Sequence, residues 1–418
     1  MIKKYKKYIN NSLIYIFSTI FAKAIPFFLL PVFTAYLSKE DYGTLGLIAS
    51  IFGIASIYVG LRPSLFLIVK SPQMSKENTA NYIFNIFIVS FYLLFIVTIV
   101  LLVLKYILFD EIATYVFVLI TLLAFFTVFN EVLETIFQIE QKAIYYSVFQ
   151  ILKTVFSVGL ALLFIIVFKM GWQGKYFADI LVIFGFALFA VYYLYKNNYI
   201  NPKVDINKQK ETIKYLFPLT FHVLGLTMMG SIDRIFLSNM VGLEVTGVYT
   251  VAYTMGALIG IVHDALLKVW SPEFYKRIKD ATLQTRIKIL KFQYLYIIGS
   301  ILMYSAFLLV MPFVFDLMVD EKFHNGYKVI PIVALGLTFE ALRKLFIGYH
   351  YNLGKNNRIA VITISAGLIN AGLNYLLIPI YGMMGAAYAT LFAYIVVFIF
   401  TIIDLNKIEN INWRLKYD

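Results

Sequence analysis

Charged side chains interrupt several long apolar stretches of this chain, and they are the residues best equipped for chemistry. The basic ones are Lys23, Arg62, Lys153, Arg234, Lys268, Arg343 and Lys344. The acidic ones are Glu131, Glu134, Asp179, Asp233, Asp264, Asp316 and Glu340. A charge at the centre of a bilayer costs about 2.5–3.5 kcal/mol on insertion scales, so it usually faces a hydrated cavity or an opposite charge.

Positive charge dominates the middle of these stretches. Glu340 is the one central acidic residue, whereas the central basic residues are Lys23, Lys153, Arg343 and Lys344. Arg62 and Lys268 lie nearer one end of their stretches, and Arg234 lies nearer the other. Snorkelling of a long side chain toward water is an alternative explanation for these last three.

Pairing between neighbours offers a structural alternative to a functional role. Three groups can neutralise themselves along one helix: Glu340 with Arg343 and Lys344, Asp264 with Lys268, and Asp233 with Arg234. Lys23 and Lys153 have no acidic residue three or four positions away. We therefore expect these two lysines to be the cations that structural pairing explains least well.

The acidic residues include candidates for holding a coupling ion. Glu131 and Glu134 share a helix face and are candidates for a proton or sodium site, together with Asp233. The alternative for the glutamates is a solvated position at the membrane edge. His222 and His263 each lie on an apolar helix, where a hydrogen-bonded core histidine is more common than a proton relay.

No catalytic motif accompanies these charges. The chain contains no GxxxxGK[ST], HExxH or GxSxG sequence, no cysteine and only four histidines. We therefore expect no enzymatic activity, no bound metal and no organic cofactor.

The composition indicates which elements position the charges. Hydrophobic residues make up 61% of the 418 and charged residues 14%, whereas typical soluble domains carry about 25% charged residues. Apolar runs of about 20 residues recur, which is the length of a membrane-spanning helix, and alternating ten-residue patterns are absent. The chain is therefore predicted to be an all-α polytopic membrane protein. Its twelve predicted spans are 11–36, 42–69, 80–104, 112–138, 144–168, 174–195, 213–239, 245–269, 291–317, 328–351, 357–379 and 383–404.

The loops between these spans carry an asymmetric charge. With the loops placed alternately, 23 lysines and arginines fall on one side and six on the other. This bias predicts that both termini lie in the cytoplasm, and it explains the net charge of +13 without a nucleic-acid partner. The longest polar connection, Lys196–Lys214, lies on the cytoplasmic side and is predicted to be an exposed linker.

Two pairs of similar short motifs predict an internal repeat. LEVTGVY at 243–249 matches SKEDYGTL at 38–45 with a shift of 204 residues, and GMMG at 382–385 matches GWQG at 171–174 with a shift of 211. Six spans in each half give both halves the same orientation, which is the pattern of parallel repeats. We expect an N-terminal lobe at 1–200 and a C-terminal lobe at 201–418, with a substrate bound between them during alternating access.

Two stretches of the chain, at 26–43 and 231–249, resemble a known family. The resemblance rests on Pro26-Phe-Phe-Leu-Leu-Pro31 with Thr34-Ala-Tyr-Leu-Ser-Lys-Glu-Asp-Tyr-Gly43, and on Ser231-Ile-Asp-Arg-Ile-Phe-Leu-Ser238 with Gly242 and Gly247-Val-Tyr249. These stretches are similar to bacterial polysaccharide flippases of the Wzx type, the O-antigen and capsule translocases. Their superfamily also holds the MATE exporters and the lipid II flippase MurJ.

The resemblance implies a V-shaped, MATE-like fold in the bacterial cytoplasmic membrane. It also implies translocation of undecaprenyl-diphosphate-linked oligosaccharides to the outer leaflet, in contact with membrane lipids and with the polysaccharide polymerase machinery. Lysine and arginine are natural partners of phosphate. The residues expected to hold the diphosphate and glycan are Lys23, Arg62, Lys153, Arg234, Arg343 and Lys344. A proton or sodium gradient is the implied energy source.

Two other functions remain open at this stage. A MATE-like cation or drug antiporter would need acidic residues at mid-depth of the first lobe, where this chain has lysines. A scaffold for a polysaccharide synthesis complex would not depend on buried charge.

Overall fold

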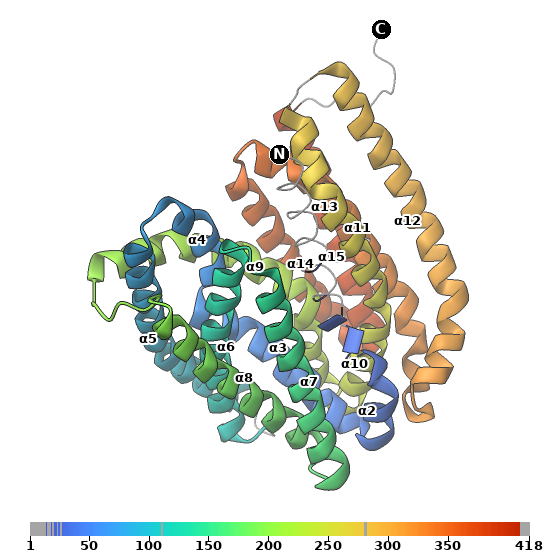
Figure 1. The fold of residues 1–418 in the computed structure, drawn as a ribbon. Coiled ribbons are helices and arrows are strands. Elements are labelled where there is room, and N and C mark those ends of the chain that lie inside the picture. Colours follow the sequence, from blue (N-terminus) through green and yellow to red (C-terminus); the bar gives the residue numbers. More distant parts are fainter. Residues whose placement is uncertain are drawn as a thin grey trace. The chain divides into compact units, whose positions relative to one another are not determined.

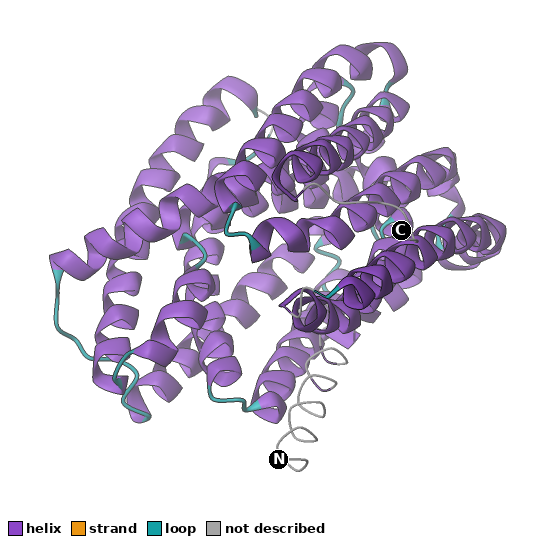
Figure 2. Ribbon diagram, turned by 90° about the horizontal axis from the view of Figure 1, so that it is seen from above, coloured by secondary structure: helices purple, strands orange, loops and turns teal. Residues whose placement is uncertain are grey.

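The computed structural model describes residues 14, 18, 21–22, 24–25, 27–109, 112–279 and 282–409. These residues form long helices joined by short connections, and no strand occurs among them (Figures 1 and 2). Helices satisfy the hydrogen bonds of their own backbone groups, and lipid offers those groups no partners. The predicted all-α class is confirmed.

The chain divides into two compact units. The first consists of the described residues up to Leu29 together with Tyr36–Leu224, and the second consists of Leu30–Ala35 together with Gly225 onward. The helices of the first unit are α3 (Lys39–Gly60), α4 (Pro63–Lys70), the short η1 (Ser71–Gln73), α5 (Lys76–Leu108), α6 (Thr114–Ile139), α7 (Ala143–Leu162), the π-helical η2 (Leu163–Val167) and α8 (Gly171–Lys196).

The second unit contains the short α2 and most of the C-terminal half. Its helices are α2 (Leu30–Tyr36), α10 (Leu243–Gly256), α11 (Leu258–Lys279), α12 (Leu283–Met318), the 3₁₀ helix η3 (Glu321–Val329), α13 (Ile330–Asn352), α14 (Asn356–Tyr381) and α15 (Met383–Glu409). The long α9 (Ile206–Met240) is divided between the two units at Leu224.

The helices agree with the predicted membrane spans. Ten helical segments of the described residues are long and apolar enough to cross a membrane, with α10 and α11 counted together. The predicted span at 328–351 corresponds to α13, which contains three charged residues. The first predicted span, 11–36, is only partly described and ends in α2. The chain is a multi-pass membrane protein.

A capping box begins α3 and also joins it to α8. Ser38 Oγ accepts from the Asp41 backbone N–H at 3.0 Å, and Asp41 Oδ2 accepts from the Ser38 N–H at 2.9 Å. Asp41 Oδ1 accepts from the Trp172 backbone N–H at 3.0 Å, beside Gly171 with its left-handed φ of 56°. Two of the motifs that predicted the repeat, around Asp41 and Trp172, are therefore in contact.

The connection between α8 and α9 is shorter and better anchored than the predicted linker. Since α9 begins at Ile206, only residues 197–205 lie between the helices. Asn85, which is fully buried on α5, donates from Nδ2 to the Lys203 carbonyl at 3.0 Å and accepts at Oδ1 from the Asp205 N–H at 2.9 Å. Residues 202–204 are exposed, as expected of a linker, but the predicted linker was too long, because residues from Ile206 onward belong to α9. Polar groups of α5 bind the backbone of the connection.

Candidate functional site

Arg62 lies at a break between two helices of the first unit. Leu61 and Arg62 have left-handed φ angles of 52° and 56°, and Pro63 opens α4. A proline disfavours helical geometry in the residue before it, so α3 cannot continue through Arg62. A left-handed residue other than glycine costs about 1–3 kcal/mol and persists where its surroundings enforce it. The eight residues of α4 place Arg62 about 12 Å from the far end of that helix, at a rise of about 1.5 Å per residue.

The guanidinium of Arg62 has no protein partner in the described part of the chain. Its Nε is buried and makes no hydrogen bond there, and no carboxylate of the described residues forms an ion pair with it. Non-helical backbone at membrane depth is tolerated where it is buried in protein or lines a water-filled cavity. Arg62 therefore combines a broken helix with a cation that is free to bind an anion.

Glu131 anchors the helix that follows Arg62. The Ser64 hydroxyl donates a short hydrogen bond to Glu131 Oε1, and the Ser64 backbone N–H lies 3.4 Å from the same oxygen. A carboxylate at this place satisfies the first turn of α4 and is favoured by the helix dipole.

Lys153 has an acidic partner on a neighbouring helix. Its Nζ lies 2.6 Å from Glu134 Oε1, with side-chain exposures of 24% and 18%. The ammonium also lies 5.4 Å from the centre of the Phe149 ring. The expectation that Lys153 is an unpaired cation was therefore wrong, because its partner comes from α6 rather than from the next turn of α7. Glu131 and Glu134 are bonded to different groups.

Asp233 and Arg234 form the centre of a buried polar cluster in the second unit. Asp233 Oδ1 accepts from Nη1 of Arg234 at 3.0 Å and from the Arg234 backbone N–H at 2.8 Å. The Tyr249 hydroxyl donates to Asp233 Oδ2, and the guanidinium carbon lies 4.1 Å from the Tyr253 ring centre. Asp233 is 0% exposed and Arg234 is 8% exposed. The structural alternative, in which Asp233 orients Arg234, describes these contacts.

The remaining two predicted cations are also paired. Arg343 donates from Nε and Nη2 to the two oxygens of Glu340, each at 2.7 Å, and both side chains are buried. Lys344 Nζ lies 2.9 Å from Asp264 Oδ1 on α11, with both side chains partly exposed. The local pairing predicted for Glu340 and Arg343 is confirmed, whereas Lys344 reaches a different helix.

The structure thus separates the six predicted substrate-binding cations. Four have carboxylate partners, namely Lys153, Arg234, Arg343 and Lys344. Lys23 lies outside the described residues. Arg62 alone among the other five has no ion pair in the part of the chain that the structure describes. Its role and that of Lys23 stay predictions.

Sequence reasoning missed the polar contacts made by aromatic and histidine side chains. Tyr249 and Tyr253 contact the Asp233–Arg234 pair but look like ordinary interfacial tyrosines in the sequence. His350 Nε2 lies 3.2 Å from Asp404 Oδ2, and Arg358 donates to the other oxygen at 2.7 Å. No spacing rule joins these residues, which come from three helices.

Three comparisons place the chain among known proteins. Residues 8–276 match the family described as polysaccharide biosynthesis protein. Two Haemophilus influenzae proteins are similar to it. One is an uncharacterised membrane protein, 23% identical over 87% of this chain and 89% of its own length. The other, Lsg locus putative protein 1, is 24% identical over 66% of this chain and 68% of its own length.

Solved structures show the same fold. An inward-facing multidrug resistance MATE family transporter of the MOP superfamily is 18% identical, with a TM-score of 0.72 over 93% of this chain and 96% of its own. A MATE protein in complex with MaD3S is 18% identical, with a TM-score of 0.62 over 97% of each chain. The fold is therefore that of the MATE transporters, as predicted. The family match spans more than half of the sequence, and the chain belongs to the polysaccharide biosynthesis protein family.

Proposed function

We propose that this protein is a flippase for undecaprenyl-diphosphate-linked oligosaccharides. It moves them from the cytoplasmic to the outer leaflet of a bacterial cytoplasmic membrane, with both of its termini in the cytoplasm. Polar and ionic groups lose their hydration in hydrocarbon, so a diphosphate and a sugar chain need a protein path across it. The family match supports a role in polysaccharide synthesis, and the fold likeness supports transport.

One observation carries the diphosphate assignment: Arg62 has a buried Nε without a partner at a broken helix. A planar guanidinium with five donors fits phosphate oxygens bidentately and stays charged at any physiological pH. A cation that already has a carboxylate must exchange that partner before it binds phosphate, whereas Arg62 need not. We therefore place the diphosphate against Arg62 and assign the paired cations supporting roles.

The contacts of the acidic residues bear on the coupling ion and on the antiporter alternative. Asp233 is the candidate for a coupling proton or sodium ion because it is fully buried, and it would have to release Arg234 to bind that ion. An antiporter for cationic drugs would use free carboxylates in the first unit. Glu131 and Glu134 there are bonded to Ser64 and Lys153, so no observation favours that alternative.

Complementation tests the proposal. A bacterial strain lacking its own O-antigen or capsule flippase should regain surface glycan with the wild-type chain and lose it with Arg62→Ala. Arg62→Lys should restore only part of the export, since lysine keeps the charge and loses the bidentate geometry. Arg286→Ala is the matched control, because Arg286 is 53% exposed and 4.0 Å from Glu409.

Two results would contradict the proposal. Failure of the wild-type chain to restore glycan in every strain tested, at normal membrane levels, would remove the flippase assignment. Normal export by Arg62→Ala would remove Arg62 from the site and leave the transporter class standing.

A further inference from the structure

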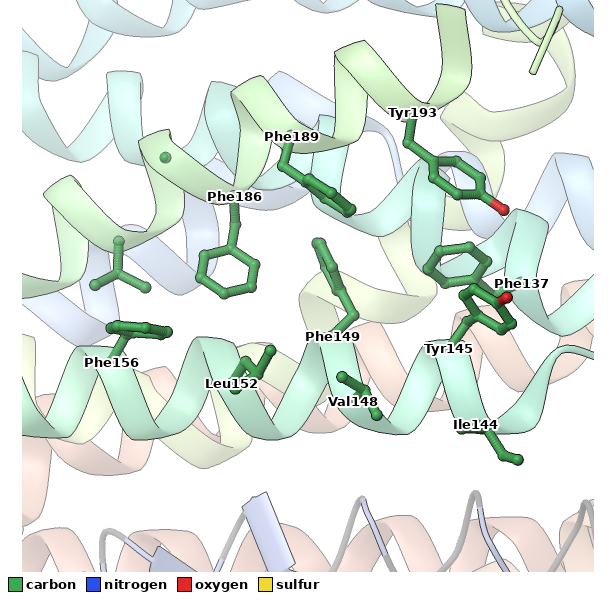
Figure 3. Close-up of a pocket in the computed structure, with 12 residues that line it drawn as sticks. Phe137, Ile144, Tyr145, Val148, Phe149, Leu152, Phe156, Phe186, Phe189 and Tyr193 are labelled. Carbon is green, nitrogen blue, oxygen red and sulfur yellow. The ribbon is translucent and has the colours of Figure 1, made fainter. Parts of the chain in front are cut away.

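An apolar groove runs between α7 and α8 of the first unit (Figure 3). Its volume is about 640 Å³, which lies within the range of about 300–1,000 Å³ for small-molecule sites. Seven of its twelve lining residues are Phe or Tyr. Phe156, Leu152 and Val148 follow one another along α7, opposite Phe186 and Phe189 of α8 (Figure 3).

The groove opens to the outside of the unit and has spare width on the α8 side. Val148 and Phe156 on α7 are 50% and 54% exposed, and Phe189 on α8 is 47% exposed. Gly185 also lines the groove, and a Cβ added there would meet no atom within 4 Å. A flexible apolar chain could therefore enter from the lipid phase and fill the space over Gly185.

One end of the groove is polar and carries two cations. The hydroxyl groups of Tyr145 and Tyr193 lie at the same end (Figure 3). Lys142, from the connection before α7, donates from Nζ to the Tyr193 hydroxyl at 3.3 Å and lies 5.7 Å from the Tyr145 ring centre. Lys196, at the end of α8, donates to the Tyr192 hydroxyl at 3.4 Å.

The charge at this end remains positive after local pairing. Lys142 lies 2.9 Å from Glu140, while Lys196 has no ion pair among the described residues. The hydrogen bond to Glu140 raises the pKa of Lys142, so its ammonium is charged at neutral pH. The distribution of loop charges assigns this end to the cytoplasmic face. An apolar slot with a cationic end is complementary to a lipid with an anionic headgroup.

We propose that the groove is a capture site for the substrate lipid: it holds the isoprenoid chain of a polyprenyl-phosphate lipid, with the phosphate beside Lys142 and Lys196, before the diphosphate passes to Arg62. The inference rests on the proposed function, since it says where the lipid part of that substrate lies. A polyprenyl chain is branched by a methyl group on every unit, so it needs a wider slot than a single acyl chain, and the open position over Gly185 supplies that width. The aromatic walls offer flat, apolar surfaces to its branched chain.

Photo-crosslinking tests the proposal directly. The photoreactive residue p-benzoylphenylalanine would replace Phe156 in the groove and, as a matched control, Phe95 on the outer surface of α5, which is also 54% exposed. The purified full chain is placed in phosphatidylglycerol–phosphatidylethanolamine vesicles that contain undecaprenyl phosphate as a minor component. Intact-protein mass spectrometry then identifies the lipid attached at each position.

The two positions should give different adducts. At position 156, undecaprenyl phosphate should be enriched over its share of the bilayer by about tenfold, which corresponds to a preference of about 1.4 kcal/mol over the phospholipids. At position 95 the adducts should follow the composition of the bilayer. Bilayer composition at both positions would overturn the proposal, because the groove would then hold ordinary phospholipid only.

A pair of glycine variants tests the groove inside cells. Gly185→Leu fills the groove, while Gly159→Leu adds the same side chain to α7 beyond the residues that line the groove, where a Cβ likewise meets no atom within 4 Å. We expect Gly185→Leu to lower both the crosslink at position 156 and glycan export by about tenfold. Gly159→Leu should leave both unchanged.

The outcomes separate the groove from the proposed function. If the wild-type chain restores glycan and Gly185→Leu does so equally well, the groove proposal is wrong and the flippase remains. If the wild-type chain fails to restore glycan but position 156 still selects undecaprenyl phosphate, the lipid site stands without the export role. The double variant Lys142→Gln, Lys196→Gln should capture less undecaprenyl phosphate than the wild-type chain, while its capture of the neutral undecaprenol should be unchanged. If the wild-type chain captures both lipids equally, the phosphate contact is contradicted.

Discussion

The ammonium of Lys153 on α7 lies 2.6 Å from the carboxylate of Glu134 on α6. Each side chain removes from the other the cost of an isolated charge in an apolar region. The contact joins two helices and neutralises a charge that otherwise stands at mid-depth, so its first role is structural. Arg62, which has no such partner among the described residues, is left as the predicted substrate-binding cation of the first unit that is most available to a ligand.

Removing one member of the Lys153–Glu134 pair should cost more stability than removing both. Lys153→Met or Glu134→Gln leaves a partly buried polar group unpaired, and we expect each to cost about 1–3 kcal/mol of stability, below the value for fully buried pairs. The double variant should recover most of that loss. Thermal unfolding of the purified protein in detergent measures this coupling.

Additive losses in the double variant would contradict the pairing. Lys105→Met serves as the control, because Lys105 lies at the end of α5, contacts the Tyr106 ring and forms no ion pair among the described residues. We expect that control to unfold at the wild-type temperature.

Substitutions in the buried cluster around Asp233 and Arg234 should lower the stability of the protein by different amounts. Asp233→Ala leaves the Arg234 guanidinium without its counter-charge, at a cost of about 3–5 kcal/mol. Tyr249→Phe removes one hydrogen bond to Asp233 and should cost about 1–3 kcal/mol. Chemical or thermal unfolding of the two variants measures the order. Equal stability of both would show that the pair and the tyrosine bond contribute alike, against the geometry described above.

A matched comparison isolates the tyrosine bond. Tyr304 is a partly buried tyrosine whose hydroxyl donates to the Pro331 carbonyl at 3.1 Å, outside the cluster. Tyr304→Phe should lose less stability than Tyr249→Phe, because hydrogen bonds to charged acceptors are roughly twice as strong as bonds between neutral groups.

The connection between α8 and α9 should loosen when its anchor is removed. Asn85→Leu keeps the size of the side chain and removes its bonds to Lys203, Asp205 and Gln209. We expect trypsin to cut after Lys203 several times faster in this variant, because local opening of a segment governs its cleavage. Gel electrophoresis and mass spectrometry of the fragments measure the rate.

The control for this experiment is another amide that bonds only to its own helix. Asn239 is exposed, and its Nδ2 donates to the Ile235 carbonyl at 2.8 Å. Asn239→Leu should leave cleavage at Lys203 unchanged. Equal rates for wild type and Asn85→Leu would show that the anchor does not hold the connection closed.

The sequence alone determined the class of the protein and the order of its helices. Apolar runs of about 20 residues have few alternatives in a membrane, since each backbone must satisfy its own hydrogen bonds. Glu340 and Arg343 were also predictable as a pair, because three positions along one helix bring two side chains to the same face. The motifs around Asp41 and Asp233 led to the family, because each lies within one short stretch of the chain.

Tertiary structure alone decided which charges are free. Lys153 finds Glu134, Lys344 finds Asp264, and His350 finds Asp404 across helix–helix contacts that no spacing in the sequence encodes. Which faces of two helices meet depends on the packing of whole helices, so a charge that looks isolated along the chain can be neutralised in space. Arg62 is the converse case: it lies at a helix break and forms no ion pair with a described carboxylate, and both facts become visible only when the helices are assembled.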